Sequence, residues 1–530
     1  MKKCFLGLLW LGATMQLTAQ EKPNFANETD LAVAGRYEAR EKDWRNGAVV
    51  YQVLVDRFAP SANLDAKRSL YASPKTLHPW NKPAERGTYS VQHKLWTHEI
   101  DFWGGDLPST LSRLDYIKSL GADVLYLNPI HLAYTNHKYD ALDYHAVSPE
   151  FGSRDDVKAL ASGLKARGMK LVLDGVFNHM GRNSPAFQAA LADEKSPYRK
   201  WFVMGAQFPG GARSWYGAEN LPELNLEHAA VREHLFEAPD SVVRKYLREG
   251  VDGWRLDVAW DLGFTHLAAL TRAAHAEKPD ALVVAEIPNY PKEWFPAVDG
   301  IMQFGLRNLT LRLANRELDA QSYGRMVNRT IADASYEHLL KSWVYLDNHD
   351  TPRLATTVPE RNARQLAQVL QFALPGSANL YYGTEVAMEG GDDPESRSPM
   401  RWERVEANHP DLAWTKTLTQ LRRSHRALRV GDYRSVEASG NVFAFERFTD
   451  RVADSTLVVV NPTLEAVIAT LMVPNSKWMD GATLIDQLGG EKATVKATLT
   501  VVKVPPQTAQ VFKLDTVPSK DGYSPFKRVQ

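Results

Sequence analysis

The sequence predicts an α/β protein built on a (β/α)8 TIM barrel with an insertion after strand 3, followed by a C-terminal all-β sandwich. Two observations support this prediction. Between residues 45 and 385, eight short apolar segments alternate with helical patterns, as expected of parallel strands that are covered on both faces. After residue 431, strand-like segments follow one another without long helices between them, which is typical of antiparallel β domains.

The predicted barrel strands are apolar runs rich in Val, Leu and Tyr: residues 48–55, 123–128, 170–176, 253–258, 282–286, 300–304, 343–348 and 379–382. Helical patterns between them cover residues 107–120, 154–167, 230–249 and 361–374. The region exceeds the roughly 250 residues typical of such a barrel, so the chain needs insertions. Residues 181–228 are rich in Pro, Gly and aromatic residues, and we expect them to form a subdomain over the barrel mouth.

These patterns divide the chain into an N-terminal extension (residues 21–45), the barrel (46–430), the sandwich (431–515) and a tail (516–530). The first 20 residues are typical of a signal peptide. Lys2 and Lys3 precede an apolar run at residues 4–15, and small residues follow it. The run is too short for a comfortable membrane span. We therefore expect a periplasmic or secreted bacterial protein with no stable membrane insertion.

The composition excludes several classes of partner and chemistry. The 530 residues include 63 Lys and Arg against 63 Asp and Glu, so the chain lacks the positive charge expected of a protein that binds nucleic acid. Its one cysteine, Cys4, lies in the predicted signal peptide, so we expect no thiol catalysis and no cysteine-based metal site.

Ionisable and amide side chains follow the predicted strands at the point where each strand ends. They are Asp174, Asn178 and His179 after the third strand, Arg255 and Asp257 after the fourth, Glu286 after the fifth, and His349 and Asp350 after the seventh. Active-site groups of (β/α)8 barrels lie at the carboxyl ends of the strands. A buried charge without a partner is costly, so we expect these side chains to meet in one site.

Two of these carboxylates suit glycoside hydrolysis. Arg255 and Asp257 are two residues apart on a strand, so their side chains share a face, and the guanidinium would favour the ionised form of Asp257. Glu286 ends a more apolar run, where desolvation would raise its pKa. One charged and one protonated carboxyl group is the pair that glycoside hydrolysis uses.

Residues 45–430 resemble the alpha-amylase superfamily, glycoside hydrolase family 13. The motifs that carry the resemblance are DGVFNH at 174–179, GWRLD at 253–257, Glu286, NHD at 348–350, LPELN at 221–225, WGGDL at 103–107 and LYYGTE at 380–385. They occur in the order typical of the family. LPELN and GWRLDVA are most similar to the neopullulanase and cyclomaltodextrinase group.

The resemblance implies a retaining alpha-glycosidase that acts on alpha-glucans or maltooligosaccharides by double displacement. Asp257 would be the nucleophile, Glu286 the general acid/base, and Asp350 the third acid, which binds sugar hydroxyls. The resemblance also implies a set of substrate-binding residues: Tyr139, His179, Arg255, His349, Asp393 and Arg397. The expected partner is an alpha-glucan oligosaccharide or polysaccharide.

The resemblance leaves the metal and the exact reaction open. Asn178 matches a calcium ligand of alpha-amylases, and Asp106 could contribute an oxygen to another site. We expect no cofactor for the reaction and retain a structural calcium ion as an alternative. Trp260 and Asp261 stand where many alpha-amylases carry a Lys-His pair, which argues against an ordinary endo-acting starch alpha-amylase.

Two other functions stay open on the same fold. A glucan transglycosylase or a sucrose-isomerase-like enzyme would use the same covalent intermediate. A non-catalytic carbohydrate-binding protein is the third alternative, against which the presence of Asp257, Glu286 and Asp350 argues.

Overall fold

Eight parallel strands form the barrel in the computed structural model, which describes residues 27–529. They are β1 (Val49–Val53), β6 (Val124–Leu127), β9 (Lys170–Gly175), β10 (Gly253–Leu256), β11 (Leu282–Ala285), β12 (Gly300–Ile301), β13 (Trp343–Val344) and β14 (Ser377–Tyr381). Neighbours pair in chain order, and β14 pairs with β1. A single parallel bridge between Met302 and Trp343 joins β12 to β13 and completes the circle. The predicted (β/α)8 barrel is confirmed.

Side chains alternate between the inside and the outside of the barrel. On β1, Val49, Tyr51 and Val53 belong to the core between the strands and the helices, whereas Val50 belongs to a separate cluster inside the barrel. Alternation follows from the period of two in a strand. The same alternation on β10 places Trp254 in the outer core, so Arg255 points into the barrel.

Helices cover the outside of the barrel. The main ones are α3 (Leu107–Ser112), α4 (Leu114–Ser119), α5 (Arg154–Ala166), α9 (Ala259–Glu277), α10 (Phe304–Ala314), α11 (Ala320–Asp333), α12 (Tyr336–Lys341), α14 (Arg361–Ala373) and α16 (Pro410–Ser424). Shorter ones are α2 (Val55–Phe58), α13 (Leu354–Thr357), α15 (Trp402–Glu406) and α17 (Arg426–Val430). The predicted helices over residues 154–167 and 361–374 correspond to α5 and α14. One face of α5 is buried, whereas α14 is buried on all sides from Leu366 to Ala373.

The predicted helix over residues 230–249 is wrong as a continuous element. The structure has α7 (Ala229–Arg232), a π-helical turn (Glu233–Glu237) and α8 (Val242–Arg248). The chain breaks at Ala238, which is extended, and Pro239 follows it. The residue before a proline is disfavoured in the α conformation, so the break is a local effect of this proline.

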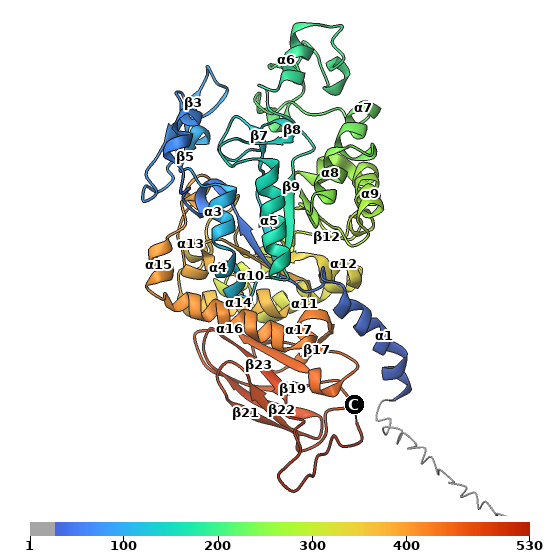
Figure 1. The fold of residues 1–530 in the computed structure, drawn as a ribbon. Helices are drawn as coiled ribbons and strands as arrows, with labels where there is room; N and C mark the ends of the chain where they lie inside the picture. The colour runs from blue at the N-terminus through green and yellow to red at the C-terminus, as the bar shows by residue number, and fades with distance from the viewer. Residues whose placement is uncertain (1–26, 530) are drawn as a thin grey trace, which may run out of the picture.

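Three excursions extend from the end of the barrel that holds the strand carboxyl ends. The first lies between β1 and α3 and contains β2 (Thr76–Leu77), β3 (Tyr89–Ser90), β4 (Leu95–Trp96) and β5 (Asp101–Phe102). The second is the hairpin of β7 (His131–Ala133) and β8 (Ala141–Val147), and the third follows β9 and contains α6 (Pro185–Ala192). Figure 1 shows β3 and α6 projecting on one side of the barrel and the C-terminal domain on the opposite side. The sequence predicts only the third excursion.

The C-terminal domain is antiparallel and all-β, as predicted. Its strands are β15 (Asp432–Ser435), β16 (Glu437–Ala438), β17 (Phe443–Phe448), β18 (Thr456–Asn461), β19 (Val467–Met472), β20 (Thr483–Asp486), β21 (Lys492–Lys496), β22 (Leu499–Val504) and β23 (Thr508–Leu514). Along β18, Leu457 and Val459 face the core of this domain, whereas Val458 and Val460 join the barrel core. Phe526 packs into the core of the domain from the tail.

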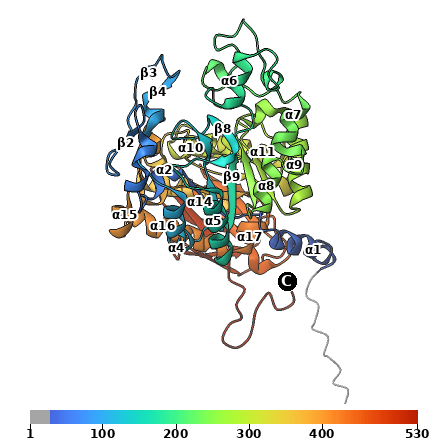
Figure 2. The same cartoon turned by 45° about the horizontal axis from the view of Figure 1, so that its top comes forward.

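The N-terminal extension forms a helix, α1 (Glu28–Lys42), beside α17 (Figure 2). Its Arg40 binds Glu337 at 2.6 Å and Asp432 at 2.8 Å, so one buried guanidinium links the extension to the barrel and to the C-terminal domain. No helix within residues 27–529 is both long and apolar enough to cross a bilayer.

Candidate active site

A buried guanidinium joins three carboxylates at the carboxyl ends of β9, β10 and β11. Nη1 of Arg255 lies 2.9 Å from Asp174 Oδ1 and 2.8 Å from Asp257 Oδ1, and Nη2 lies 3.0 Å from Glu286 Oε2. Arg255 is fully buried inside the barrel. The structure therefore brings Asp257 and Glu286 together around one cation, and Asp174 holds the same cation from the neighbouring strand.

The protonation of this cluster differs from the prediction. Burial raises the pKa of Asp257 well above its ordinary value, although Arg255 opposes the shift. Burial also raises the pKa of Glu286, again against Arg255. The sequence predicts that Arg255 keeps Asp257 ionised, but this cation is shared among three carboxylates. One positive charge cannot neutralise three negative charges, so the cluster favours retention of a proton.

Val258, the residue after Asp257, orients Glu286. Its backbone N–H donates a hydrogen bond of 2.9 Å to Glu286 Oε2. Its φ is 47°, a left-handed conformation that is unfavourable for a β-branched residue. The surrounding structure maintains this strain, as is common where a backbone group serves a site. Nothing in the sequence predicts it.

Asp350 lies in the loop after β13, and two basic side chains hold it. His349 Nε2 lies 3.0 Å from its Oδ2, and Arg397 Nη2 lies 3.0 Å from its Oδ1. Desolvation alone would raise the pKa of Asp350, but His349 and Arg397 keep it well below its usual range. The negative charge of Asp350 in turn raises the pKa of Glu286, so the third acid lies within electrostatic reach of the other two.

Asp393 and Arg397 form one unit with this loop. Arg397 Nε lies 3.1 Å from Asp393 Oδ1 and donates a hydrogen bond of 2.8 Å to the carbonyl oxygen of His349. The loop after β14, which carries both residues, is thus fixed to the loop after β13. Asp393 remains partly exposed, so it can accept hydrogen bonds from a ligand.

Tyr139 and His349 stack in parallel, with ring centroids 5.5 Å apart. The Tyr139 hydroxyl contacts His349 Nε2 at 2.5 Å and donates to Asp174 Oδ2 at 3.0 Å. Side-chain amides of Gln52 and Asn128 lie 2.9 Å and 3.1 Å from His349 Nδ1. These two amides fix the orientation of the His349 ring, so that Nε2 faces Asp350.

Sequence reasoning missed Gln52 and Asn128. Both are buried polar residues on strands that are otherwise apolar, β1 and the end of β6. A polar residue in an apolar strand is the signal that could have found them, because burial of an amide requires hydrogen-bond partners.

His179 lies beside Trp215, with ring centroids 5.7 Å apart and nearly parallel planes. Burial lowers the pKa of His179 to about 3, so the ring is neutral near pH 7. Its Nε2 is buried and has no hydrogen-bond partner within residues 27–529. A buried nitrogen without a partner is suited to a ligand hydroxyl.

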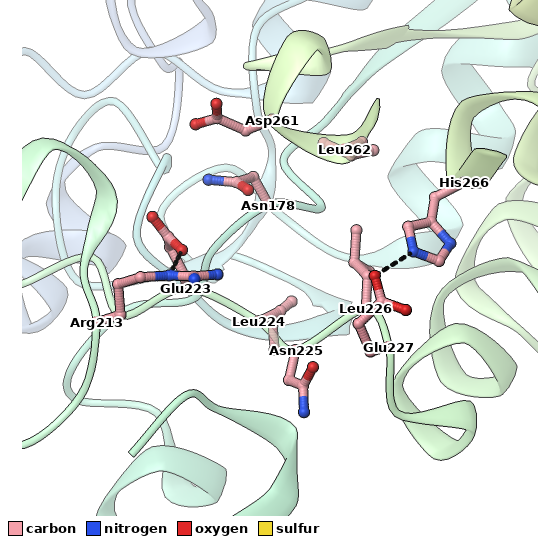
Figure 3. A pocket seen from close by; sticks show the side chains of 10 residues that line it. All are labelled: Asn178, Arg213, Glu223, Leu224, Asn225, Leu226, Glu227, Asp261, Leu262 and His266. Atoms are coloured by element: carbon pink, nitrogen blue, oxygen red, sulfur yellow. Dashed lines mark hydrogen bonds and ion pairs between the residues drawn. The ribbon is translucent and has the colours of Figure 1, made fainter. Parts of the chain in front are cut away.

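The two predicted metal ligands lie in different places. Asp106 caps α3 by accepting from Ser109 N at 2.7 Å, and Lys67 Nζ binds its other oxygen at 2.7 Å. Asn178 lines a cavity of about 400 Å³ with Glu223 and Asp261 (Figure 3). Glu223 is paired there with a cation.

The cation that pairs with Glu223 is the guanidinium of Arg213. Protein cations therefore already bind Asp106 and Glu223, so these two carboxylates are not free to bind a calcium ion. The calcium ligand expected at Asn178 stays a prediction. No cluster of three or more His, Cys, Asp or Glu side chains suited to a metal occurs in the described part of the chain.

A buried ion-pair cluster supports the segment that carries Tyr139. The Glu150 carboxylate contacts Lys75 Nζ at 2.5 Å and Lys138 Nζ at 3.3 Å, and accepts from Ser148 Oγ at 2.8 Å. Lys138, which precedes Tyr139, is fully buried. Burial alone would raise the pKa of Glu150, but the charges of Lys138 and Lys75 lower it to about 2.

Replacing Glu150 with glutamine is expected to destabilise the protein by about 3 kcal/mol at pH 7, because the fully buried Lys138 and the partly buried Lys75 lose their partner. The folded pKa of Glu150, about 2, lies below the ordinary value of 4.5. Its stabilisation is therefore complete above pH 4.5 and is lost as the pH falls through about 2. Urea unfolding of both proteins between pH 3 and pH 7 measures this, and a difference independent of pH would contradict it.

Comparisons with known proteins identify relatives of the whole barrel. Neopullulanase 2 of Thermoactinomyces vulgaris is 33% identical over 475 residues, which cover 86% of this chain and 77% of the relative. A cyclomaltodextrinase of Bacillus sp is 31% identical over 429 residues, which cover 79% of this chain and 73% of the relative. The predicted similarity to this group is confirmed.

The relatives contradict the predicted location. Two proteins of Bacillus subtilis, each 31% identical over 403 residues that cover 73% of this chain, are named intracellular maltogenic amylase. The prediction of a periplasmic or secreted protein is therefore wrong. The prediction rested only on the length of the apolar run and on the residues that flank it. Such a pattern alone is weak evidence for where a protein is located. The predicted signal peptide, residues 1–20, lies outside the described residues.

A family model and a solved structure cover most of the chain. The model described as the alpha amylase catalytic domain matches residues 52–425. The cyclic alpha-maltosyl-(1→6)-maltose hydrolase of Arthrobacter globiformis, in complex with that sugar, superposes with a TM-score of 0.75 at 28% identity, over 89% of this chain and 99% of the hydrolase. This chain belongs to the alpha-amylase family of glycoside hydrolases.

Proposed function

We propose that the protein hydrolyses alpha-glucosidic bonds of cyclic and short linear maltooligosaccharides and retains the anomeric configuration. One observation carries the proposal: Asp257 and Glu286 share the Arg255 guanidinium, at 2.8 Å and 3.0 Å, within electrostatic reach of Asp350. The names of the relatives, cyclomaltodextrinase and neopullulanase, support the substrate class.

The first step forms a covalent intermediate. A carboxylate oxygen of Asp257 attacks the anomeric carbon, and the glycosidic bond breaks as Glu286 donates its proton to the leaving oxygen. The raised pKa of Glu286 keeps that proton available near neutral pH. Arg255 stabilises Asp257 as an anion when the substrate enters, because it contacts the attacking carboxylate directly.

The second step reverses the roles. Glu286, now a carboxylate, takes a proton from water, and the water oxygen attacks the anomeric carbon and releases Asp257. The hydrogen bond from Val258 N to Glu286 stabilises the carboxylate form that this step requires. Both displacements invert the carbon, so the product retains the alpha configuration.

The remaining side chains bind the sugar at the point of cleavage. Asp350 and Asp393 accept hydrogen bonds from its hydroxyls, since both carboxylates are held at the mouth by Arg397. Tyr139 provides an aromatic face, and His179 Nε2, which lacks a protein partner within residues 27–529, bonds another hydroxyl. We propose that the reaction needs no cofactor, because protein groups supply every proton and charge in these steps.

Transfer to a sugar acceptor is not favoured as the main activity, and neither is isomerisation of sucrose. The relatives by sequence are named as cyclomaltodextrinase and neopullulanase, and a structural neighbour as a hydrolase. A non-catalytic binding protein is also not favoured, because Asp257, Glu286 and Asp350 are all present and held by Arg255 and Arg397.

The test is a product analysis of the full-length enzyme on maltotriose, maltoheptaose, cyclomaltodextrins, pullulan and sucrose, repeated after dialysis against EDTA. We expect hydrolysis of the maltooligosaccharides and cyclomaltodextrins at a rate that EDTA does not change. Activity on sucrose alone, or products longer than the substrate as the main species, would contradict the proposal.

A further inference from the structure

The hairpin of β3 and β4 carries two exposed aromatic residues. Tyr89 is 46% exposed and Trp96 is 38% exposed. Their rings pack edge to face with centroids 5.8 Å apart, and the Arg86 guanidinium lies 5.3 Å from the Trp96 ring. Large aromatic side chains usually bury most of their surface, and a group of exposed ones commonly marks a binding surface.

The backbone under this pair is fixed rather than loose. Trp96 N donates to Glu99 Oε2 at 2.6 Å, and Glu99 contacts His137 Nε2 at 3.4 Å. The Asn136 side-chain amide donates to the carbonyl oxygens of His98 and Asp101, each at 2.7 Å. The segment that leads to Tyr139 of the active site therefore anchors the base of the hairpin.

The segment that leads into the hairpin contacts the sugar-binding loop after β14, because Ala84 N donates a hydrogen bond of 3.0 Å to Ser398 Oγ. His98 stacks on Trp96 with ring centroids 6.0 Å apart. Burial lowers the pKa of His98, and the negative charge of Asp393 opposes that shift, so His98 lies within electrostatic reach of Asp393.

The tip of the hairpin reaches the insertion after β9. Lys94 Nζ lies 3.4 Å from Glu219 Oε1, and Glu219 follows the exposed Tyr216 by three residues. The hairpin that carries the aromatic pair therefore contacts the inserted subdomain at its tip.

We propose that Trp96 and Tyr89 form a further sugar-binding subsite, on which a glucose unit of the alpha-glucan stacks beyond the unit that Asp393 and Arg397 contact. The inference rests on the proposed function for its substrate class. A pyranose ring presents an apolar C–H face, which suits an aromatic surface, and its hydroxyls suit the donors of a polar rim. Arg86 and Lys94 supply those donors.

The test measures binding and hydrolysis separately in the full-length protein. In the Glu286→Gln enzyme, calorimetry gives the Kd for maltose and for maltoheptaose. We expect Trp96→Ala to weaken maltoheptaose binding about tenfold more than maltose binding, the loss of one stacked ring. Tyr89→Ala should give a smaller loss, and Trp96→Phe should restore most of the affinity.

Tyr523→Ala is the matched control, since Tyr523 is 58% exposed in the tail beyond the C-terminal domain. An equal effect of Trp96→Ala on both sugars, or an effect no larger than that of the control, would overturn the subsite. If Trp96-dependent binding occurs but the wild-type enzyme hydrolyses no alpha-glucan, the subsite stands and the proposed function fails. If hydrolysis occurs without a Trp96 effect, only the subsite fails.

Discussion

Asp257→Asn is expected to lower kcat for maltotriose by about 10⁴-fold or more, because an amide is a poor nucleophile and the covalent step has no substitute. The side chain is nearly isosteric, and Arg255 keeps two other carboxylate partners, Asp174 and Glu286. We therefore expect the variant to fold, and thermal unfolding followed by circular dichroism checks this.

The matched control is Asp252→Asn. Asp252 lies at the other end of the same strand, where it binds Lys278 Nζ at 2.6 Å and accepts from Leu171 N at 3.0 Å. Residues at the amino ends of barrel strands serve stability. This variant is expected to lower the unfolding temperature and to keep most of kcat. If the two variants lost the same activity, Asp257 would not be the nucleophile.

Arg255→Met is expected to abolish activity and to cost about 3–5 kcal/mol of stability at neutral pH, because it leaves three buried carboxylates without their cation. The charge of Arg255 offsets part of the upward pKa shift of both Asp257 and Glu286. Without Arg255, both pKa values rise further. A carboxyl group whose pKa is higher in the folded than in the unfolded protein destabilises the fold once the pH is high enough to ionise it. The loss of stability therefore grows as the pH rises.

Urea unfolding of Arg255→Met at pH 5 and pH 8 measures this effect. We expect a larger loss at pH 8 than at pH 5, while Arg312→Met, which breaks the exposed pair with Glu317, costs about 1 kcal/mol or less. Arg255→Lys should keep part of the stability but little activity, since one ammonium cannot span two carboxylates as a guanidinium does. Equal losses at both pH values would contradict the shared-cation account.

The sequence predicts the barrel well because its strands are buried on both faces. Each of the eight observed strands lies within or next to a predicted apolar run. The carboxyl ends of parallel strands meet at one end of the barrel, so Asp257, Glu286 and Asp350 could be assigned to one site without coordinates. Arg255 and Asp257 share a face for an equally local reason, the period of two in a strand.

What the sequence could not predict depends on contacts between distant segments. The protonation of Asp257 depends on how many carboxylates share Arg255, and Asp174 joins that cluster from another strand. Gln52 lies 2.9 Å from His349 Nδ1 although 297 positions of sequence separate the two residues. The hairpin of β3 and β4 has strands of only two residues, which are too short to give a periodic pattern.

The central claim is that Asp257 forms a bond to the sugar while Glu286 holds the proton for the leaving group. Mass spectrometry of the Glu286→Gln enzyme after reaction with alpha-maltosyl fluoride tests it most directly, because fluoride leaves without a proton donor and the second step lacks its base. We predict one glycosyl unit attached to the peptide that contains Asp257. A sugar on any other residue, or release of a beta-configured product without an adduct, would contradict the mechanism.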